Sequence, residues 1–211
     1  MMKLFPCLMF VLVLAANAIS LAAPAITKEQ IEADWLRQQE LRALPAPVTV
    51  TNDAAGGCDG VVDGKWGFHT SHEQQPWWQV DLGQETAIDR LRLFNRCDSF
   101  AERNARCLVM LSTDGTSWTQ AYQHDGTVFY GHSDSKPLEV NLSGAKARFV
   151  RIQLLGTDYL HLDEVEVYAV GSAENIALNR PATQSSISQW SAAHGASDNT
   201  FMSLDSLLKR A

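Results

Sequence analysis

The chain is short of positive charge. Its 211 residues hold 17 lysines and arginines against 24 aspartates and glutamates, which gives a formal net charge of −7. Nucleic-acid-binding proteins usually carry a basic face that supplies most of their affinity, so this balance argues against that class. The sequence also has no basic amphipathic helix of the kind that lies on a membrane surface. We therefore expect neither nucleic acid nor stable membrane insertion.

Long apolar runs are scarce too. One run follows Lys3 near the start, and it falls short of the roughly 20 residues that cross a bilayer. Small residues come next, with acceptable cleavage patterns at Ala16-Asn-Ala18 and Ser20-Leu-Ala22. Residues 1–22 are therefore expected to be a signal peptide, and the mature protein to be secreted and extracellular, or periplasmic if bacterial.

Cysteine is also sparse. Beyond the signal the chain keeps Cys58, Cys97 and Cys107, an odd number that leaves at least one without a partner in the same chain. Cys97 and Cys107 bracket a loop that contains two arginines. Two interpretations stay open: a disulfide that fixes this loop, or two small buried thiols.

Residues 26–46 are predicted to form a short helix. Thr27 with Gln30 fits a capping box, and Pro45 and Pro47 stop the helix. The apolar face is only partial, which favours a helical spacer over the alternative, a helix that binds a partner.

Residues 48–170 have the pattern of an all-β domain. Runs rich in β-branched and aromatic residues alternate with turn signals such as Asp114-Gly115 and Asp125-Gly126. Seven or eight strands are expected, among them 77–82, 88–94, 107–111, 118–122, 138–142, 150–154 and 165–168. Strands of period 2 bury one face against a second sheet, so the expected fold is an antiparallel jelly-roll β-sandwich.

The pattern begins again after Gly171. The run from Gly60 to Trp66 has a counterpart from Gly195 to Phe201, and residues 175–184 look like a new first strand. About forty residues cannot build a second sandwich, because the partner sheet is missing. We expect residues 171–211 to be the truncated start of a second domain, poorly ordered or continued in a longer chain.

His69, Arg96, Asp98 and Arg103 are the candidate binding residues. Arginine offers five fixed donors, and histidine can donate or accept. Two guanidiniums and an imidazole, with a carboxylate to orient one of them, suit a neutral polyhydroxylated ligand. No catalytic carboxylate pair, nucleophile elbow or phosphate loop is recognisable, so an enzyme is not expected. The alternative is that both arginines are surface charges paired with Asp98 and Glu102.

The sequence around these residues resembles the F-type lectins, the fucolectins of the discoidin-like superfamily. His69 is separated from Arg96-x-Asp98-x-x-x-x-Arg103 by 26 residues, as in that family. The run from Pro76 to Gly83 and the run from Leu160 to Tyr168 are also similar to the family's, and residues 175–183 resemble another domain opening. The resemblance implies a jelly roll that binds L-fucose at one end through the histidine and both arginines, while Asp98 orients an arginine.

The resemblance also raises the question of an apolar platform for the sugar. The family often has two adjacent cysteines where this chain has Ser99-Phe100. Phe100 either covers the C–H side of the sugar or is buried in the core. Phe68 is a second candidate, for packing on the fucose methyl group.

A structural calcium ion is implied as well. Asp63 and Glu164 match two side-chain ligands of the family, and loop carbonyls would supply others. The loop from Asp63 to His69 is shorter than usual, and Thr70 or Ser71 would have to replace the expected hydroxyl ligand. The alternative is an ordinary Asp-Gly turn and a solvated glutamate.

Functions from different classes therefore remain open. The first is a secreted carbohydrate-binding module for fucosylated glycans, in which a homo-oligomer would gain avidity from linked weak sites. The second is a discoidin-type adhesion or scaffold module that binds protein or lipid surfaces and uses the arginines in structural ion pairs. The third is an accessory module of a secreted carbohydrate-active enzyme.

Overall fold

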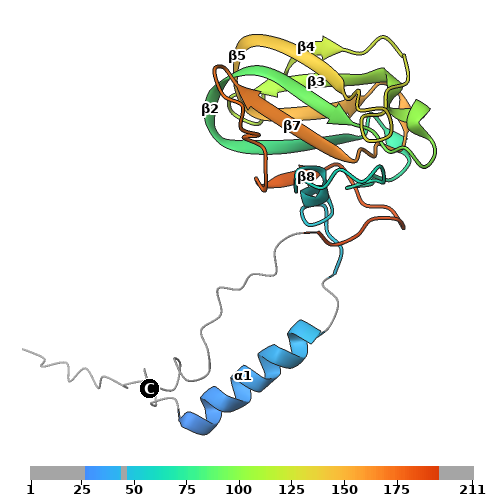
Figure 1. Cartoon of the computed structure of the whole chain (residues 1–211). Helices are drawn as coiled ribbons and strands as arrows, with labels where there is room; N and C mark the ends of the chain where they lie inside the picture. The colour runs from blue at the N-terminus through green and yellow to red at the C-terminus, as the bar shows by residue number, and fades with distance from the viewer. Residues whose placement is uncertain (1–26, 44–46, 195–211) are drawn as a thin grey trace, which may run out of the picture. The chain divides into compact units, whose positions relative to one another are not determined.

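The computed structural model describes residues 27–43 and 47–194. The chain falls into two compact units: one holds the helix α1 (Lys28–Ala43), and the other, residues 44–200, holds the strands (Figure 1). The expected signal peptide and the repeat at residues 195–201 lie outside the described residues. Within the two described ranges, no helix has the length and apolarity needed to span a membrane.

Helix α1 begins at the capping box that the sequence predicts. The backbone N–H of Thr27 donates to Oε1 of Gln30 at 2.8 Å, and the N–H of Gln30 donates to Oγ1 of Thr27 at 3.3 Å. These bonds satisfy two amide groups that have no partner within the first helical turn. The helix ends at Ala43, just before the predicted stop at Pro45.

Two long strands organise the domain. β2 (Trp77–Phe94) and β5 (Leu138–Leu154) run antiparallel, and register shifts between Asp81 and Thr86 and after Ile88 divide β2 into two halves. The sequence predicted each half as a separate strand. The chain stays extended instead, because Gly83, at φ +85°, takes up the bend that a side chain would resist.

Strand pairing falls into two layers (Figure 1). In the larger layer, the end of β5 and the start of β2 are neighbours, flanked by β3 (Cys107–Ser112) with β4 (Thr119–Gln123) on one side and β8 (Ala182–Gln184) on the other. In the smaller layer, the end of β2 lies between the start of β5 and β7 (Glu164–Ala169). The expected discoidin-like β-sandwich is confirmed.

One hydrophobic core joins the two layers. Leu91 and Leu93 are fully buried and alternate with the more exposed Arg90 and Arg92, as the period-2 pattern predicts. The core holds side chains from both layers, including Trp78, Val80, Val109, Val140, Val150, Val165 and Val167. Burial of each such side chain stabilises the fold by roughly 1.5–3 kcal/mol.

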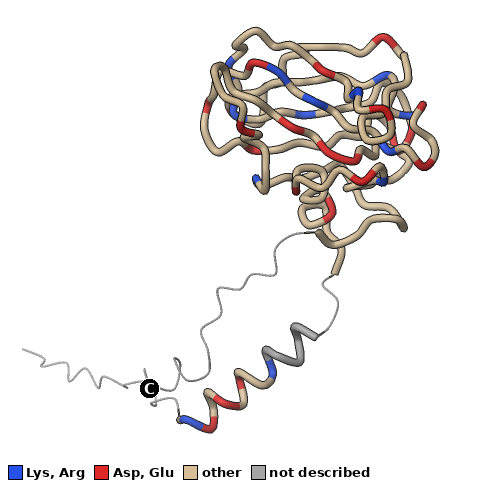
Figure 2. Tube along the Cα trace, in the orientation of Figure 1, with Lys and Arg blue, Asp and Glu red and all other residues tan. Residues whose placement is uncertain are grey.

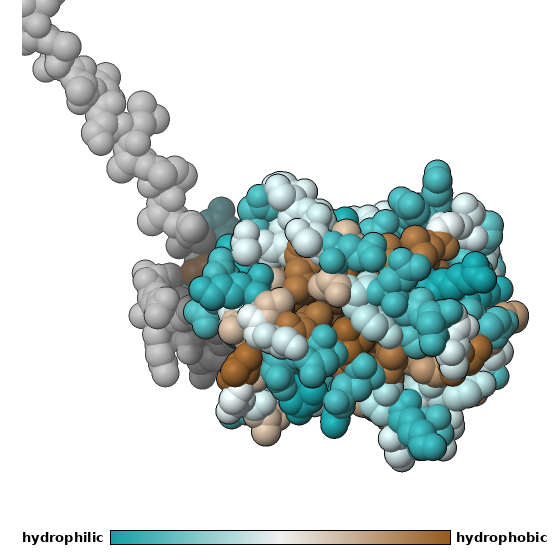
Figure 3. Space-filling model, turned by 90° about the horizontal axis from the view of Figure 1, so that it is seen from above, coloured by the Kyte–Doolittle hydropathy of each residue, from teal (hydrophilic) through white to brown (hydrophobic). Residues whose placement is uncertain are grey.

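Short elements connect the strands. They comprise two 3-10 helices, η1 (Ala54–Gly57) and η2 (Ala101–Arg106), and a small two-stranded sheet of β1 (Glu73–Gln74) and β6 (Thr157–Asp158). Acidic and basic residues are interspersed over the strands rather than gathered on one face (Figure 2). Seen from above, apolar side chains show between polar ones (Figure 3).

Cys58, Cys97 and Cys107, the three cysteines among the described residues, are free thiols. Cys107 is buried in β3, and the thiol of Cys97 contacts the carbonyl oxygen of Asn95 at 3.5 Å. The structure therefore excludes a disulfide between Cys97 and Cys107, which was one of the two interpretations that the sequence left open. The arginine loop between them is held by hydrogen bonds instead.

The segment after β7 packs on the domain that precedes it. β8 pairs antiparallel with the start of β2, with Ala182 opposite Val80 and Gln184 opposite Trp78. For the described residues 171–194, the structure differs from the expectation of poor order. The reason is that the free edge of β2 offers unpaired backbone groups, and the segment satisfies them. The expectation that residues 171–211 are the start of a second domain stays a prediction.

Candidate functional site

His69, Arg96 and Arg103 line a single cavity. Its volume is about 240 Å³, and the other lining residues are Trp66, Phe100, Tyr159 and Trp190. Sites for drug-sized ligands span roughly 300–1,000 Å³, so this cavity suits a ligand about the size of one monosaccharide. The structure thus brings together the three groups that the sequence spacing singled out.

Asp98 holds Arg96 in a fixed plane. Nε and Nη2 of Arg96 donate to the two carboxylate oxygens of Asp98 at 2.6 and 2.7 Å, and Nη2 also reaches Oγ of Ser99 at 3.2 Å. The guanidinium carbon lies 4.5 Å from the centroid of the Trp66 ring. The hydrogen bonds from Arg96 lower the pKa of Asp98, so the pair stays charged. Nη1 keeps two N–H donors that no described residue accepts.

Arg103 lies in η2 between two aromatic rings. Its guanidinium carbon is 4.1 Å from the ring centroid of Phe100 and 5.0 Å from that of Tyr159. Its Nε lies 3.4 Å from a carboxylate oxygen of Asp158, a loose ion pair. The rings therefore orient the guanidinium, and most of its donors remain available to a ligand.

His69 presents an acceptor to the cavity. Its Nδ1 lies 2.9 Å from the carbonyl oxygen of Thr70 and 3.1 Å from Oγ of Ser188. A carbonyl can only accept, so Nδ1 carries the proton and Nε2 of the neutral ring has a free lone pair. Burial, and after it the positive charges of Arg96 and Arg103, lower the pKa of His69. The ring is therefore neutral at pH 7.

A buried hydrogen-bond network supports the loop that carries Arg96 and Arg103, on the side away from the cavity. Nδ2 of Asn104 donates to Oδ1 of Asn95 at 2.6 Å and to the carbonyl oxygen of His161. His161 is fully buried, and its ring centroid is 5.0 Å from that of His69. Burial, and to a smaller extent the proximity of His69 and Arg96, lowers the pKa of His161 to about 3. This layer behind the cavity stays neutral.

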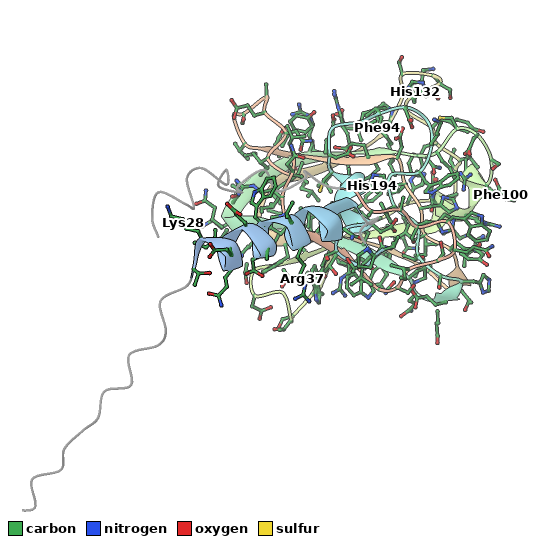
Figure 4. The ribbon with its side chains drawn as sticks, turned by 90° about the horizontal axis from the view of Figure 1, so that it is seen from below. Lys28, Arg37, Phe94, Phe100, His132 and His194 are labelled. Carbon is green, nitrogen blue, oxygen red and sulfur yellow. The ribbon has the colours of Figure 1, made fainter. Side chains whose placement is uncertain are left out.

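Two exposed aromatic rings line the cavity. Phe100 is 48 % exposed and Trp190 is 42 % exposed, and Phe100 projects from one end of the domain (Figure 4). Phe100 is therefore not a core residue, and its contact with a sugar stays a prediction. Phe68, in contrast, is fully buried and stacks on Trp78 with ring centroids 5.6 Å apart. The expected contact between Phe68 and a sugar is therefore corrected: its ring belongs to the core.

Three lining residues were missed by the sequence reasoning. Trp66 lies in the short loop before His69, and Tyr159 lies beside β6, so their closeness to predicted site residues was a usable signal. Trp190 gave no such signal, because its segment resembles the opening of another domain.

The two expected calcium ligands, Asp63 and Glu164, have separate hydrogen-bond partners. The carboxylate of Asp63 accepts from the N–H of Lys65 at 2.9 Å and lies 3.5 Å from its Nζ. Glu164 is fully buried: Oε1 accepts from the N–H of Gly60 at 3.2 Å, and Oε2 has no partner among the described residues. Burial, with smaller contributions from neighbouring carboxylates, raises the pKa of Glu164 to about 9.

The surrounding groups fit a calcium ion only in part. The hydroxyls of Thr70 and Ser71 donate to the backbone carbonyls of Ser71 and Ile187. The carboxylate next to the Asp63 turn is that of Asp163, which accepts from the N–H of Gly64 at 2.8 Å. Over the described residues, no group of three or more His, Cys, Asp or Glu side chains is placed to hold a metal. Oε2 of Glu164, which is buried without a hydrogen-bond partner, is a feature that suits a cation.

A larger hollow elsewhere carries no comparable chemistry. It measures about 570 Å³, lies between β3, β4 and β5, and has Lys146 as its one charged lining residue. Volume alone would favour this hollow as the ligand site. Converging donors, an acceptor and aromatic rings favour the cavity at His69, which we take as the candidate site.

Comparison with known proteins identifies a family for the strand domain. The F5/8 type C domain family matches residues 47–165. Fucolectin-6 of Anguilla japonica is 32 % identical over 102 residues, 48 % of this chain and 53 % of its own length. Fucolectin-1 of the same organism is 32 % identical over 105 residues, 48 % and 57 % of the two chains. This chain thus spans about half the length of the curated relatives it matches. The crystal structure of an f-lectin (fucolectin) from Morone saxatilis (striped bass) serum is 25 % identical, with a TM-score of 0.50 over 59 % of this chain and 44 % of that chain.

Proposed function

This chain belongs to the F5/8 type C domain family, and we propose that it is a secreted carbohydrate-binding module that recognises L-fucose-type sugars with His69, Arg96 and Arg103. One observation carries the proposal: an imidazole acceptor and two sets of arginine donors face one cavity of about 240 Å³. The names of the two relatives, both fucolectins, support fucose as the sugar.

The donor and acceptor pattern suits a neutral hydroxyl. A sugar hydroxyl donates one proton and accepts others, so it can donate to Nε2 of His69 while it accepts from Arg96 and Arg103. A carboxylate has no proton to donate, and it would face the lone pair of the neutral imidazole. An epimer whose hydroxyl points elsewhere would leave buried donors unpaired, at a cost of about 1–3 kcal/mol each.

The cavity also suits the apolar side of a deoxy sugar. L-Fucose carries a methyl group and a C–H face, and these pack well on an aromatic ring. Phe100 offers such a ring beside Arg103 and is 48 % exposed. The size of the cavity favours a single terminal sugar of a fucosylated glycan. Affinity for one such sugar would be modest, and oligomerisation of the chain would add avidity.

A structural calcium ion is a secondary part of the proposal. Its support is the buried, unpartnered Oε2 of Glu164, an oxygen that a cation would satisfy. Loop carbonyls would have to provide most of the six to eight ligands that calcium takes.

Titration of the full chain with L-fucose and D-galactose tests the proposal. We expect saturable binding of L-fucose with a Kd between about 1 µM and 1 mM, as for a small polar site. The double variant Arg96→Ala, Arg103→Ala should lose binding while its melting temperature changes little. Arg92→Ala is the matched control, because that arginine lies on β2 and forms a surface ion pair with Glu139 of β5.

Two outcomes would contradict the proposal. If the parent chain shows no saturable binding of L-fucose or D-galactose with calcium present, a carbohydrate-binding function is excluded. Unfolding of the double variant, with Arg92→Ala still folded, would assign the arginines to structural ion pairs. That second outcome would favour an adhesion or scaffold module.

A further inference from the structure

Residues 175–192, which we term the closing segment, reach the candidate site from outside the family match. The match ends at residue 165, yet Trp190 lines the cavity. The closing segment resembles the opening of a further domain. Its contacts nevertheless lie with the strand domain that precedes it.

Backbone hydrogen bonds fix the closing segment along β2. The N–H of Asp81 donates to the carbonyl oxygen of Pro181 at 2.9 Å, and the N–H of Ser185 donates to that of Trp77 at 2.9 Å. The N–H of Gln184 donates to the carbonyl oxygen of Val50 at 3.2 Å. β8 is thus the outer strand of the larger layer rather than a loose tail.

Asp53 ties the closing segment to His69. This carboxylate is fully buried. Its Oδ2 accepts from the N–H of His69 at 3.0 Å and from Nε2 of Gln184 at 2.7 Å, while Oδ1 accepts from the N–H of Ala192 at 2.6 Å. One buried carboxyl group therefore holds the backbone of the candidate histidine and two points of the closing segment together.

Two serines of the closing segment contact His69 directly. Oγ of Ser188 lies 3.1 Å from Nδ1 of the imidazole, and Oγ of Ser191 donates to the carbonyl oxygen of His69 at 2.7 Å. The N–H of Trp190 donates to the same Ser188 hydroxyl at 3.1 Å. The tilt of the imidazole and the position of Trp190 are therefore set by one local hydrogen-bond group.

Trp190 itself has the placement of a sugar platform. Its carbonyl oxygen accepts from Nε1 of Trp66 at 3.1 Å, and its ring centroid lies 5.0 Å from that of His69 and 5.5 Å from that of Tyr159. The ring is fixed by these neighbours on one side and is still 42 % exposed. A fixed, half-exposed aromatic face beside converging donors suits the C–H face of a pyranose.

We propose that Trp190 contacts the bound sugar and that the closing segment is an integral wall of the carbohydrate site. The ligand is a neutral pyranose with an apolar face, as in the proposed function on which this inference rests. The binding unit then extends from residue 47 to residue 192, beyond the matched region.

Variants of Trp190 in the full chain test the inference. Trp190→Ala should weaken L-fucose binding by about five- to tenfold, the loss expected for one aromatic contact. Ile187→Ala is the matched control, because Ile187 is 39 % exposed in the same segment and does not line the cavity. The change of intrinsic tryptophan fluorescence on adding L-fucose should shrink in Trp190→Ala and persist in Ile187→Ala.

Trp190→Phe and Trp190→Leu separate contact from folding. Both substitutions supply apolar volume, but only phenylalanine supplies an aromatic face. At equal melting temperature, Trp190→Phe should therefore bind L-fucose more tightly than Trp190→Leu does. Equal binding by the parent, Trp190→Phe and Trp190→Leu would overturn the role of Trp190 and leave the proposed function intact. A parent chain that binds no L-fucose would overturn both.

Discussion

The carboxylate of Asp98 holds the guanidinium of Arg96 by two parallel hydrogen bonds, from Nε to Oδ1 at 2.6 Å and from Nη2 to Oδ2 at 2.7 Å. The arginine side chain is only 6 % exposed. Its rotation is therefore restricted by the pair on one edge and by Trp66 on one face. A lysine has no planar fork and could not keep this arrangement.

Asp98→Asn should reduce L-fucose affinity by about tenfold, because the amide cannot accept both arginine bonds and Arg96 would lose its fixed plane. Asp98 is partly exposed, so the free energy of unfolding should fall by only about 1 kcal/mol, well below the loss for a buried pair. Calorimetric titration and thermal melting measure the two effects. Asp125→Asn, in an exposed turn, serves as the control. Parental affinity in Asp98→Asn would exclude an orienting role for Asp98.

L-Fucose binding should weaken in acid because of His69. The pKa of His69 is lowered in the folded protein, so the neutral acceptor form prevails above the ordinary value of about 6.5 and persists somewhat below it. Affinity should therefore stay level from pH 8 to about 6.5 and decline only at lower pH, as Nε2 gains a proton.

His69→Gln is the matched variant for this pH profile, since an amide can accept but does not titrate in this range. We expect weaker binding with a flat profile. Circular dichroism at each pH checks that the domain remains folded. Tighter binding of the parent in acid would show that His69 acts as a charged donor, contrary to the acceptor geometry.

Stability of the metal-free domain should fall as pH rises through the range set by Glu164. Burial raises its pKa from 4.5 to about 9, so the folded state holds this proton more tightly than the unfolded chain does. Its stabilising contribution is complete below pH 4.5 and is lost as pH approaches and passes 9. The melting temperature of Glu164→Gln should fall less steeply between pH 7 and about 9.

Calcium should compete with that proton. If Glu164 is a ligand, added calcium raises the melting temperature more at pH 8 than at pH 5, because only the ionised carboxylate binds the cation. A chelator should reverse the gain, and Glu164→Gln should show none. A calcium effect of the same size in Glu164→Gln would place the ion elsewhere.

Phe100 should show opposite effects on binding and stability. Its backbone is left-handed, at φ +59°, a conformation that costs a residue of this type roughly 1–2 kcal/mol. Asparagine adopts it more readily, so Phe100→Asn should keep or raise the free energy of unfolding, even after losing roughly 0.5–1 kcal/mol of stacking on Arg103.

The same change removes the ring beside Arg103, so L-fucose affinity should fall in Phe100→Asn. Urea unfolding and sugar titration on one sample compare the two quantities. Val128→Ala, another exposed apolar residue outside this cavity, is the control for nonspecific surface effects. A simultaneous loss of stability and affinity would mean that the left-handed backbone at Phe100 stores no strain.

Much of the fold followed from alternation in the sequence. Leu91 and Leu93 face the core while Arg90 and Arg92 face outward, because a strand inverts its side chains at every residue. The continuity of β2 through Gly83 did not follow. A glycine turn signal marks a bend, and the bend here is absorbed within one strand by a register shift.

The candidate site was predictable where spacing along the chain matched a known arrangement, as for His69, Arg96 and Arg103. It was not predictable where burial decides. Phe68 and Phe100 are chemically alike, and only packing against Trp78 separates the core residue from the exposed one. Trp190 was not predicted as a site residue. Its segment resembles the start of another domain, and that resemblance does not reveal that the segment packs on the preceding one.

The pairing of β8 with β2 also protects the protein from aggregation. Without that strand, the backbone of Trp78 to Val80 would form an open sheet margin flanked by apolar side chains, a template for intermolecular β-pairing. A fragment cut after β7 should therefore lose solubility, since neighbouring copies would compete to cap one another. The three residues of β8, Ala182–Gln184, thus cover the sheet edge and prevent it from starting a fibre.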